Sequence, residues 1–245
     1  MRLKALLRPL VYLSLAGLAA CGSNPPSPSA ATPESTPTAP GTPVAPIRIG
    51  LALGGGAVKG FAHIGVIKML EANGLAPAVV SGTSAGSVVG ALYAGGMNAF
   101  DLQEKAVALD ETRIRDLQLS SGGLLVGQKL EDYVNEQVGR KPLEQLAKPF
   151  VAVSTRLEDG ERTVFARGNT GQAVRASSSI PGVFQPVAIG KFHFVDGGIT
   201  SPVPVDAARQ LGADLVIAVD ISNKARGKAP ENMLGALGQS IAIMG

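Results

Sequence analysis

Histidine and cysteine are scarce in this sequence of 245 residues, which contains two histidines and one cysteine. A single cysteine excludes an intrachain disulfide. An excess of charge is also lacking beyond the N-terminus: there are 22 Lys and Arg against 19 Asp and Glu residues, and all three charges within residues 1–20 are basic. The balanced remainder gives no electrostatic basis for binding nucleic acid, and no basic run follows residue 20 to bind an anionic surface.

The composition that remains is typical of a globular α/β protein. Hydrophobic residues make up 45% and charged residues 17% of the chain, and there are 31 glycines. These proportions argue against overall disorder, and the length suffices for one well-buried domain or two small ones. Because the sequence shows no internal repeat, we expect one domain over residues 47–245.

The N-terminus has the pattern of an export signal. Residues 1–20 combine a basic start, "MRLKALLR", with the apolar stretch "PLVYLSLAGLAA", which is too short to span a bilayer. The stretch ends at Leu18-Ala19-Ala20-Cys21, which resembles a bacterial lipobox, so we expect Cys21 to carry a lipid. An ordinary signal peptide with a chance cysteine is the alternative. Gly22 after the cysteine, by the same resemblance, favours the outer membrane facing the periplasm over the inner membrane.

Residues 21–46 predict a tether between this anchor and the domain. The segment is rich in Pro, Ser, Thr and Ala, and its only charge is Glu34. Such a composition cannot bury enough apolar surface to offset the entropy of ordering. The expected arrangement is therefore lipid, extended tether and domain, with the lipid chains holding the protein at a membrane.

The body of the chain alternates strand and helix patterns. Short apolar runs predict strands at 47–53, 77–82, 191–198 and 214–221. Helical periodicity predicts helices at 61–74, 84–96, 98–118, 128–138, 204–212 and 231–245. Asp159-Gly160 predicts a hairpin within 149–168. The β-α-β-α order at the start indicates an α/β fold with a parallel sheet covered by helices.

A serine between two glycines stands where the second strand meets the second helix, in Gly82-Thr83-Ser84-Ala85-Gly86. G-x-S-x-G at such a junction is typical of a nucleophile elbow, which presents the serine hydroxyl at the carboxyl edge of a sheet. A purely structural tight turn is the alternative. The pattern makes Ser84 the candidate nucleophile.

The proton acceptor for Ser84 decides the type of enzyme. An α/β-hydrolase has the order Ser, acid, His, whereas His63 precedes Ser84 with no aspartate between them. His63 falls within the first predicted helix and His193 within a strand three residues before Asp196, so structural roles are expected for both and a Ser-His-Asp triad is disfavoured. Asp196 in "FVDGG" follows an apolar strand, and partial burial could raise its pKa enough for it to act as a base. As Asp-Gly, it could equally be a turn residue.

A third candidate feature is the glycine loop "LGGGAVKGFAH" at 53–63. Backbone N–H groups in such a loop can bind a phosphate or the oxyanion of an acyl intermediate. A P-loop is disfavoured because Gly60 and Phe61, rather than Ser or Thr, follow Lys59. A dinucleotide fingerprint is disfavoured by glycine spacing one residue too wide.

Taken in order, "GGGAVKG", "GTSAG" and "DGG" resemble the patatin-like phospholipase family. The stretches "HIGVIKMLE", "GLLVGQKLEDY", "AVRASSSIPGVFQPV" and "SPVP" add to the resemblance, which covers about residues 47–222. It implies a three-layer α/β/α fold with a central, mostly parallel sheet. It also implies a Ser-Asp dyad that hydrolyses acyl esters of lipids without a metal or other cofactor.

Carried over by position, the resemblance makes Ser84 the nucleophile and Asp196 its base. The family's loop has three glycines, a variable residue, a basic residue and a glycine. Counted back from Lys59 and Gly60, the positions of the oxyanion-hole amides are Gly55, Gly56 and Ala57, so that an alanine replaces the third glycine. The glycines and the basic residue expected to support the site are Gly54, Lys59, Gly60, Gly82, Gly86, Gly197 and Gly198.

Lys59 is expected to orient the loop by hydrogen bonding, and Ser177–Ser179 with Pro181 to form a turn beneath the site. The expected activity is that of a phospholipase A or lysophospholipase acting on membrane phospholipid or another acyl ester. Three alternatives stay open: an acyltransferase or non-lipid esterase with the same dyad, a non-catalytic membrane-anchored binding lipoprotein, and a nucleotide-binding domain.

Overall fold

The computed structural model describes residues 46–108 and 125–222, with 227, 230–233, 235–236 and 239. The chain divides into two units, Met1–Val44 and Ala45–Gly245, and all of the helices and strands below belong to the second. The expected signal, Cys21 and nearly all of the tether lie outside the described residues, as do the second half of the helix expected at 98–118 and most of the one at 231–245.

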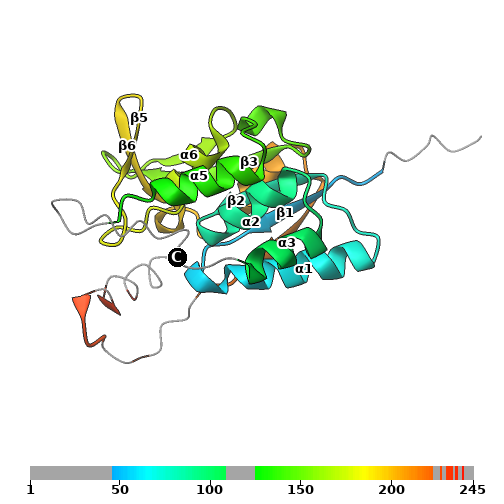
Figure 1. Cartoon of the computed structure of the whole chain (residues 1–245), viewed down its shortest axis with the longest axis horizontal. Helices are drawn as coiled ribbons and strands as arrows, with labels where there is room; N and C mark the ends of the chain where they lie inside the picture. The colour runs from blue at the N-terminus through cyan, green and yellow to red at the C-terminus, as the bar shows by residue number, and fades with distance from the viewer. Residues whose placement is uncertain are drawn as a thin grey trace, which may run out of the picture. The chain divides into compact units, whose positions relative to one another are not determined.

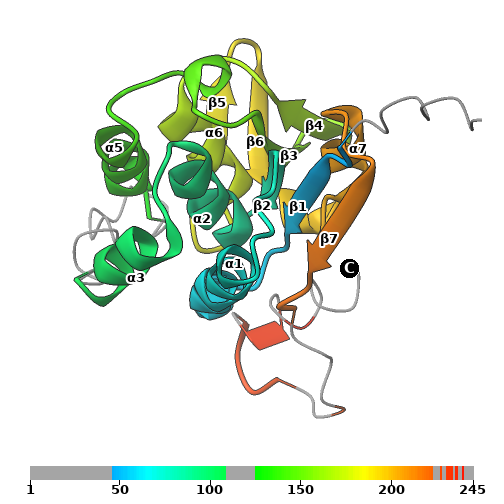
Figure 2. The same ribbon diagram turned by 90° about the vertical axis from the view of Figure 1, so that its right-hand side faces the viewer.

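A seven-stranded sheet forms the centre of the fold (Figure 2). Its order is β5-β6-β3-β2-β1-β7, with β4 paired to β3. The strands are β1 (Ile49–Leu53), β2 (Val79–Thr83), β3 (Phe150–Arg156), β4 (Arg162–Phe165), β5 (Val187–Ile189), β6 (Phe192–Asp196) and β7 (Leu215–Val219). The four strands β3, β2, β1 and β7 are parallel, whereas β4, β5 and β6 pair antiparallel. The sequence-based expectation of an α/β fold with a mostly parallel sheet is confirmed.

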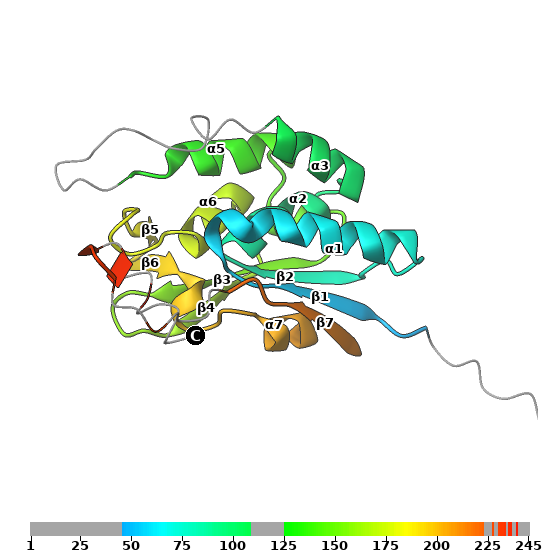
Figure 3. The ribbon, with the colours of Figure 1, turned by 90° about the horizontal axis from the view of Figure 1, so that it is seen from below.

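Helices cover both faces of this sheet (Figure 3). One face carries α1 (Phe61–Ala72), α2 (Ala85–Ala94), α3 (Ala99–Val107), α5 (Gln128–Gln137) and α6 (Thr170–Ser177), and the other carries α7 (Val205–Gln210). The largest group of buried apolar side chains lies between the sheet and α1, α2, α5 and α6. Figure 1 labels the helices α1, α2, α3, α5 and α6 of the first face. Among the described helices, none has the length and hydropathy that a membrane span requires.

The ends of two strands meet on one edge of β3. β2 runs parallel to the first half of β3 as far as the pair Thr83 and Val153. β6 approaches from the opposite direction along the second half and ends at Asp196 opposite Ser154. β4 pairs along the opposite edge of β3, with residues that also pair with β2 and with β6. β2 and β6 therefore lie on the same edge of β3. The residues that follow β2 and end β6 are thereby brought together, although they are far apart in the sequence.

Most elements expected from the sequence are present. The hairpin around Asp159-Gly160 forms as β3 and β4, and the strands at 191–198 and 214–221 form as β6 and β7. Two elements had no prediction, α6 and the short strand β5. α6 begins at an Asn169 cap and buries mainly small or polar residues, so its sequence has few large apolar side chains to mark a helix.

Candidate active site

Ser84 occupies a sharp turn between β2 and α2. Its φ of 53° and ψ of −124° are sparsely populated by any residue other than glycine, and such strain costs about 1–3 kcal/mol. The flanking glycines permit the turn: a β-carbon on Gly82 would lie 2.6 Å from the Cα of Ser87, and one on Gly86 would lie 2.1 Å from the carbonyl oxygen of Leu53. The elbow geometry expected from G-x-S-x-G is therefore present.

The Ser84 hydroxyl donates a hydrogen bond to Asp196. The distance from Oγ to Asp196 Oδ2 is 2.6 Å, and the backbone N–H of Gly198 donates to the other carboxylate oxygen at 2.7 Å. Ser84 and Asp196 are only 6% and 5% exposed. A β-carbon on Gly197 would lie 2.1 Å from the carbonyl oxygen of Val153, so only glycine lets the chain after Asp196 approach β3 this closely. One carboxylate oxygen is fixed by an amide, and the other faces the serine.

Burial changes the acid strength of Asp196. Removal of the carboxylate from water raises its pKa from 3.8 to about 6, although the hydrogen bonds from Ser84 and Gly198 act in the opposite direction. An aspartate with this pKa is largely ionised at neutral pH, and yet it is a much stronger base than an exposed one. It has the proton affinity that a general base for Ser84 requires.

The glycine loop lies beside Ser84, and its amides have different partners. Gly54 donates its N–H to Val219 O at 3.0 Å, and Gly55 donates to Pro202 O at 2.9 Å. This corrects the expected set of three oxyanion-hole amides, because the N–H of Gly55 is already bonded. Within the described part of the chain, the N–H groups of Gly56 and Ala57 have no acceptor.

Ala57, which stands where the resemblance implies a third glycine, adopts a glycine-like conformation. Ala57 has a φ of 51°, in the left-handed region, where a β-carbon costs about 1 kcal/mol. The preceding Gly56 packs against the chain after β7, where a β-carbon would lie 2.5 Å from the carbonyl oxygen of Ile221. The backbone of the loop is therefore strained at Ala57.

Lys59 and Gly60 connect the loop to its surroundings. The Lys59 ammonium donates to the carbonyl oxygens of Ile221 at 3.2 Å and Ser222 at 2.9 Å, in agreement with the expected loop-orienting role. A β-carbon on Gly60 would lie 3.0 Å from the β-carbon of Ala85, the residue that follows Ser84. These contacts hold the start of α1 close to the elbow.

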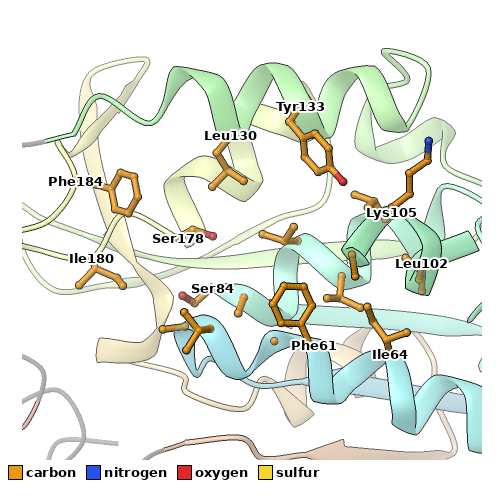
Figure 4. A pocket seen from close by; sticks show the side chains of 18 of the residues that line it. Phe61, Ile64, Ser84, Leu102, Lys105, Leu130, Tyr133, Ser178, Ile180 and Phe184 are labelled. Carbon is orange, nitrogen blue, oxygen red and sulfur yellow. The ribbon is translucent and has the colours of Figure 1, made fainter. Parts of the chain in front are cut away.

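A cavity of about 600 Å³ opens above Ser84 (Figure 4). Its walls come from the helices on this face of the sheet and from the segment after α6. Most of the side chains that line it are apolar, among them Phe61, Ile64, Val88, Leu92, Leu102, Leu130, Ile180, Val183 and Phe184. Lys105 is the one charged residue of this lining within the described residues. A long apolar group could thus reach Ser84 away from water.

Neither histidine ring hydrogen-bonds to Ser84. His63 is fully buried, and its Nε2 bonds the carbonyl oxygen of Gly54 at 2.8 Å, which makes Nε2 the protonated nitrogen. Burial lowers the pKa of His63, although the bond to Gly54 raises it. His193 is exposed and pairs with Glu158 on the surface. The sequence-based argument against a Ser-His-Asp triad agrees with this arrangement.

A further residue at the site had no expected role. The Ser177 hydroxyl accepts a hydrogen bond from the backbone N–H of Ser84 at 2.9 Å and donates one to Val153 O at 2.6 Å. Ser177 is the last residue of α6 rather than part of a turn, and it is fully buried. The only sequence signal was a serine run at the end of a segment of small residues, which does not reveal these partners.

Chemically, the site combines a hydroxyl, a buried carboxylate with a raised pKa, two amides without acceptors and an apolar cavity. Across the described ranges, no group of three or more His, Cys, Asp or Glu residues could hold a metal ion. An α/β fold that presents a serine on such an elbow is typical of enzymes that use this serine as a nucleophile.

Comparison with known proteins identifies the family. The model of the patatin-like phospholipase family matches residues 51–209, and the chain belongs to this family. An uncharacterized NTE family protein of Mycobacterium tuberculosis is 38% identical over 184 residues, which cover 74% of this chain and 51% of that protein. Human patatin-like phospholipase domain-containing protein 6 is 32% identical over 202 residues, which cover 79% of this chain and 14% of that protein.

Two further proteins are similar to this chain. Lysophospholipase NTE1 of the fungus Pyricularia oryzae is 31% identical over 181 residues, which cover 71% of this chain and 12% of that protein. The crystal structure of VipD from Legionella pneumophila has a TM-score of 0.54 at 18% identity and covers 63% of this chain and 46% of that chain, which shows the shared fold. The chain spans about half the length of the mycobacterial relative and a smaller share of the human and fungal ones.

Proposed function

We propose that this protein is a serine lipid acyl hydrolase in which Ser84 is the nucleophile and Asp196 the general base. The observation that carries the proposal is the 2.6 Å hydrogen bond from Ser84 Oγ to Asp196 Oδ2 at the floor of the apolar cavity. The family supports an acyl ester as the substrate. The raised pKa of the carboxyl gives it the basicity that the reaction needs.

In the acylation step, the Ser84 hydroxyl proton moves to Asp196 Oδ2 as Oγ attacks the ester carbonyl carbon. The carbonyl oxygen becomes an oxyanion that accepts hydrogen bonds from the amides of Gly56 and Ala57. Each well-placed donor of this kind contributes roughly 3–4 kcal/mol to the transition state. The bond from the carbonyl carbon to the alcohol oxygen then breaks, and the alcohol leaves with the proton from Asp196.

In the deacylation step, water attacks the acyl-enzyme and gives its proton to Asp196. The bond to Ser84 Oγ breaks, Oγ takes the proton back, and the fatty acid is released. The same oxyanion site serves both steps because the carbonyl carbon stays attached to Ser84 between them. The dyad ends in its starting protonation state.

The lining of the cavity favours a lipid over a polar ester. Each methylene that leaves water contributes about 0.8 kcal/mol, so an acyl chain gains affinity with every carbon that the cavity accommodates. One relative is named a lysophospholipase, which agrees with this substrate class. Phospholipids and lysophospholipids are therefore the proposed substrates.

Fatty-acid release from mixed phospholipid and lysophospholipid micelles by the full chain tests the proposal. Ser84→Ala should abolish release. Ser81→Ala is a matched control, because Ser81 is a buried serine of β2, three residues before Ser84, and its hydroxyl donates to Pro204 O at 2.8 Å. Release that persists at the wild-type level in Ser84→Ala would contradict the assignment. Transfer of the acyl group to an added alcohol in preference to water would instead favour an acyltransferase.

We also propose that the protein is an exported lipoprotein, anchored through Cys21 in the outer membrane and facing the periplasm. The lipobox-like sequence before Cys21 and the proline-rich tether after it support this proposal. The intact mass of the purified protein should show a cleaved chain that begins at a lipid-modified Cys21. Cys21→Ala should leave the membrane fraction, and its retention there would argue against this anchor.

A further inference from the structure

An exposed apolar face runs along α1. The helix buries His63, Ile64 and Ile67, and yet its opposite side is also apolar. Successive residues of this side are three or four positions apart, which makes them neighbours on a helix surface. A surface helix normally directs polar side chains to water, so an exposed apolar side indicates a partner. With the turn that precedes the helix, this side comprises the exposed residues Val58, Phe61, Ala62, Gly65, Met69 and Ala72, which we call the α1 face.

The charged residues of α1 lie beside this face and do not interrupt it. Glu71, the only carboxylate of the helix, accepts a hydrogen bond from the backbone N–H of Ala99 on α3 at 3.0 Å. Lys68, the only basic residue, donates to Gln103 Oε1 at 3.0 Å, and its Nζ lies 4.5 Å from the centre of the exposed Phe100 ring. A lysine next to apolar side chains suits a surface that combines acyl chains with phosphate groups.

The α1 face meets the mouth of the cavity. Val58 and Phe61 line the cavity and are also 74% and 55% exposed, so these two residues stand at its opening. Figure 4 shows the Phe61 ring on the cavity wall, where it projects from α1. An acyl chain could therefore pass from the α1 face to Ser84 along apolar side chains. This continuity favours a lipid bilayer over a soluble protein as the partner.

We propose that the α1 face is the surface with which this protein lies on a phospholipid bilayer, with the mouth of the cavity directed into the lipid. This inference rests on the proposed function, because a lipid substrate has to leave the bilayer to reach Ser84. A helix that lies in a membrane interface buries its apolar side about 5–10 Å deep and directs basic side chains to the headgroups. A lipid on Cys21 would hold the protein at a membrane without orienting it, and the α1 face supplies the orientation.

An environment-sensitive fluorophore on an introduced cysteine of the full chain tests the proposal. Ala62→Cys and Met69→Cys place the label on the α1 face but outside the lining of the cavity. The vesicles contain equal parts of ether-linked phosphatidylcholine and phosphatidylglycerol. Ether lipids have no ester bond, so contact is measured whether or not the protein hydrolyses lipids. On addition of vesicles, the emission of both labels should rise several-fold and move to shorter wavelength.

Leu157→Cys is the matched control. Leu157 is also apolar and 52% exposed, but its N–H donates to His193 O of β6, in a part of the sheet that lies away from α1 (Figures 1 and 2). A label there should not respond to vesicles, and wild-type protein taken through the same labelling gives the contribution of Cys21. Adding Ala62→Glu to the Met69→Cys chain should remove most of the response, because a carboxylate would then have to enter an apolar environment.

The outcomes separate this inference from the proposed function. Labels on the α1 face that do not respond to vesicles, or respond no more than the label at position 157, overturn the inference, even where the protein releases fatty acid from a dissolved ester. Emission already shifted without vesicles also overturns it: a second copy covers the face if the shift depends on protein concentration, and another part of the same chain covers it if not. If the labels respond but no ester is cleaved, the docking surface stands and the proposed function fails.

Discussion

Replacing the buried carboxylate of Asp196 should stabilise the protein and, on the proposed function, abolish its activity. Asp196→Asn keeps the size of the side chain and an oxygen that can accept from the Gly198 amide. It removes the buried negative charge. The burial of this charge is what raises the pKa of Asp196 from 3.8 to about 6. An acid with a raised pKa in the folded state binds its proton more tightly there than in the unfolded chain.

The sign and size of the effect follow from this difference in pKa. Below about pH 3.8 the aspartate is protonated in both the folded and the unfolded state, and it does not lower the free energy of unfolding. As the pH rises through the interval up to about 6, the unfolded chain loses its proton first, so the free energy of unfolding falls. At pH 8 the total loss is roughly 3 kcal/mol, and about half of it develops between pH 5 and pH 8.

Urea unfolding of both proteins at pH 5, 6.5 and 8 measures this contribution. The stability difference between Asp196→Asn and the wild type should be smallest at pH 5 and should grow as the pH rises, because the amide does not titrate. Asp132→Asn, a change on the exposed surface of α5, controls for loss of a carboxylate in general. A difference that stays constant with pH, or a variant that is less stable at pH 8, would refute the argument from burial.

Three further outcomes are expected. The kcat/KM of the wild type should rise with pH through about 6, because Asp196 must be ionised to accept the serine proton, and a pH profile flat from 5 to 8 would contradict this. Ser177→Ala should lower kcat about tenfold with KM unchanged, because it releases the backbone of the nucleophile, whereas Ser179→Ala should not. Gly86→Ala should prevent formation of the elbow, because its methyl group would lie 2.1 Å from the Leu53 carbonyl oxygen, so soluble expression and secondary structure by circular dichroism should fall sharply.

The sequence identifies Ser84 and Asp196 as candidates more readily than it predicts that their side chains are in contact. Ser84 is marked by flanking glycines at the end of an apolar run, and local sterics alone require small residues there. Asp196 is marked only by a strand and two glycines. Its position opposite Ser154 depends on the register of an antiparallel strand, and register is set by tertiary packing rather than by local pattern.

Hydrogen-bond partners are the part of the site that could not be predicted. Gly55 was expected to offer its amide, but the loop packs against the chain near Pro202 and that amide is bonded there. Ser177 and Ser178 are adjacent and identical in type, and yet the hydroxyl of Ser177 bonds the backbone of Ser84 whereas that of Ser178 has no partner among the described residues. Such differences arise from the direction of each side chain at a helix end, which composition and periodicity do not specify.

The basicity of Asp196 and the shape of the elbow have a common structural origin. Close backbone packing around the ends of β2 and β6 removes water from the carboxylate and thereby raises its pKa. The same packing requires glycine at positions 86 and 197, where any β-carbon would meet a carbonyl oxygen at 2.1 Å. A larger residue at position 197 would move the end of β6 away from β3, admit water and return the pKa of Asp196 toward 3.8. The glycines of this site therefore influence its acid–base chemistry, although they carry no titratable group.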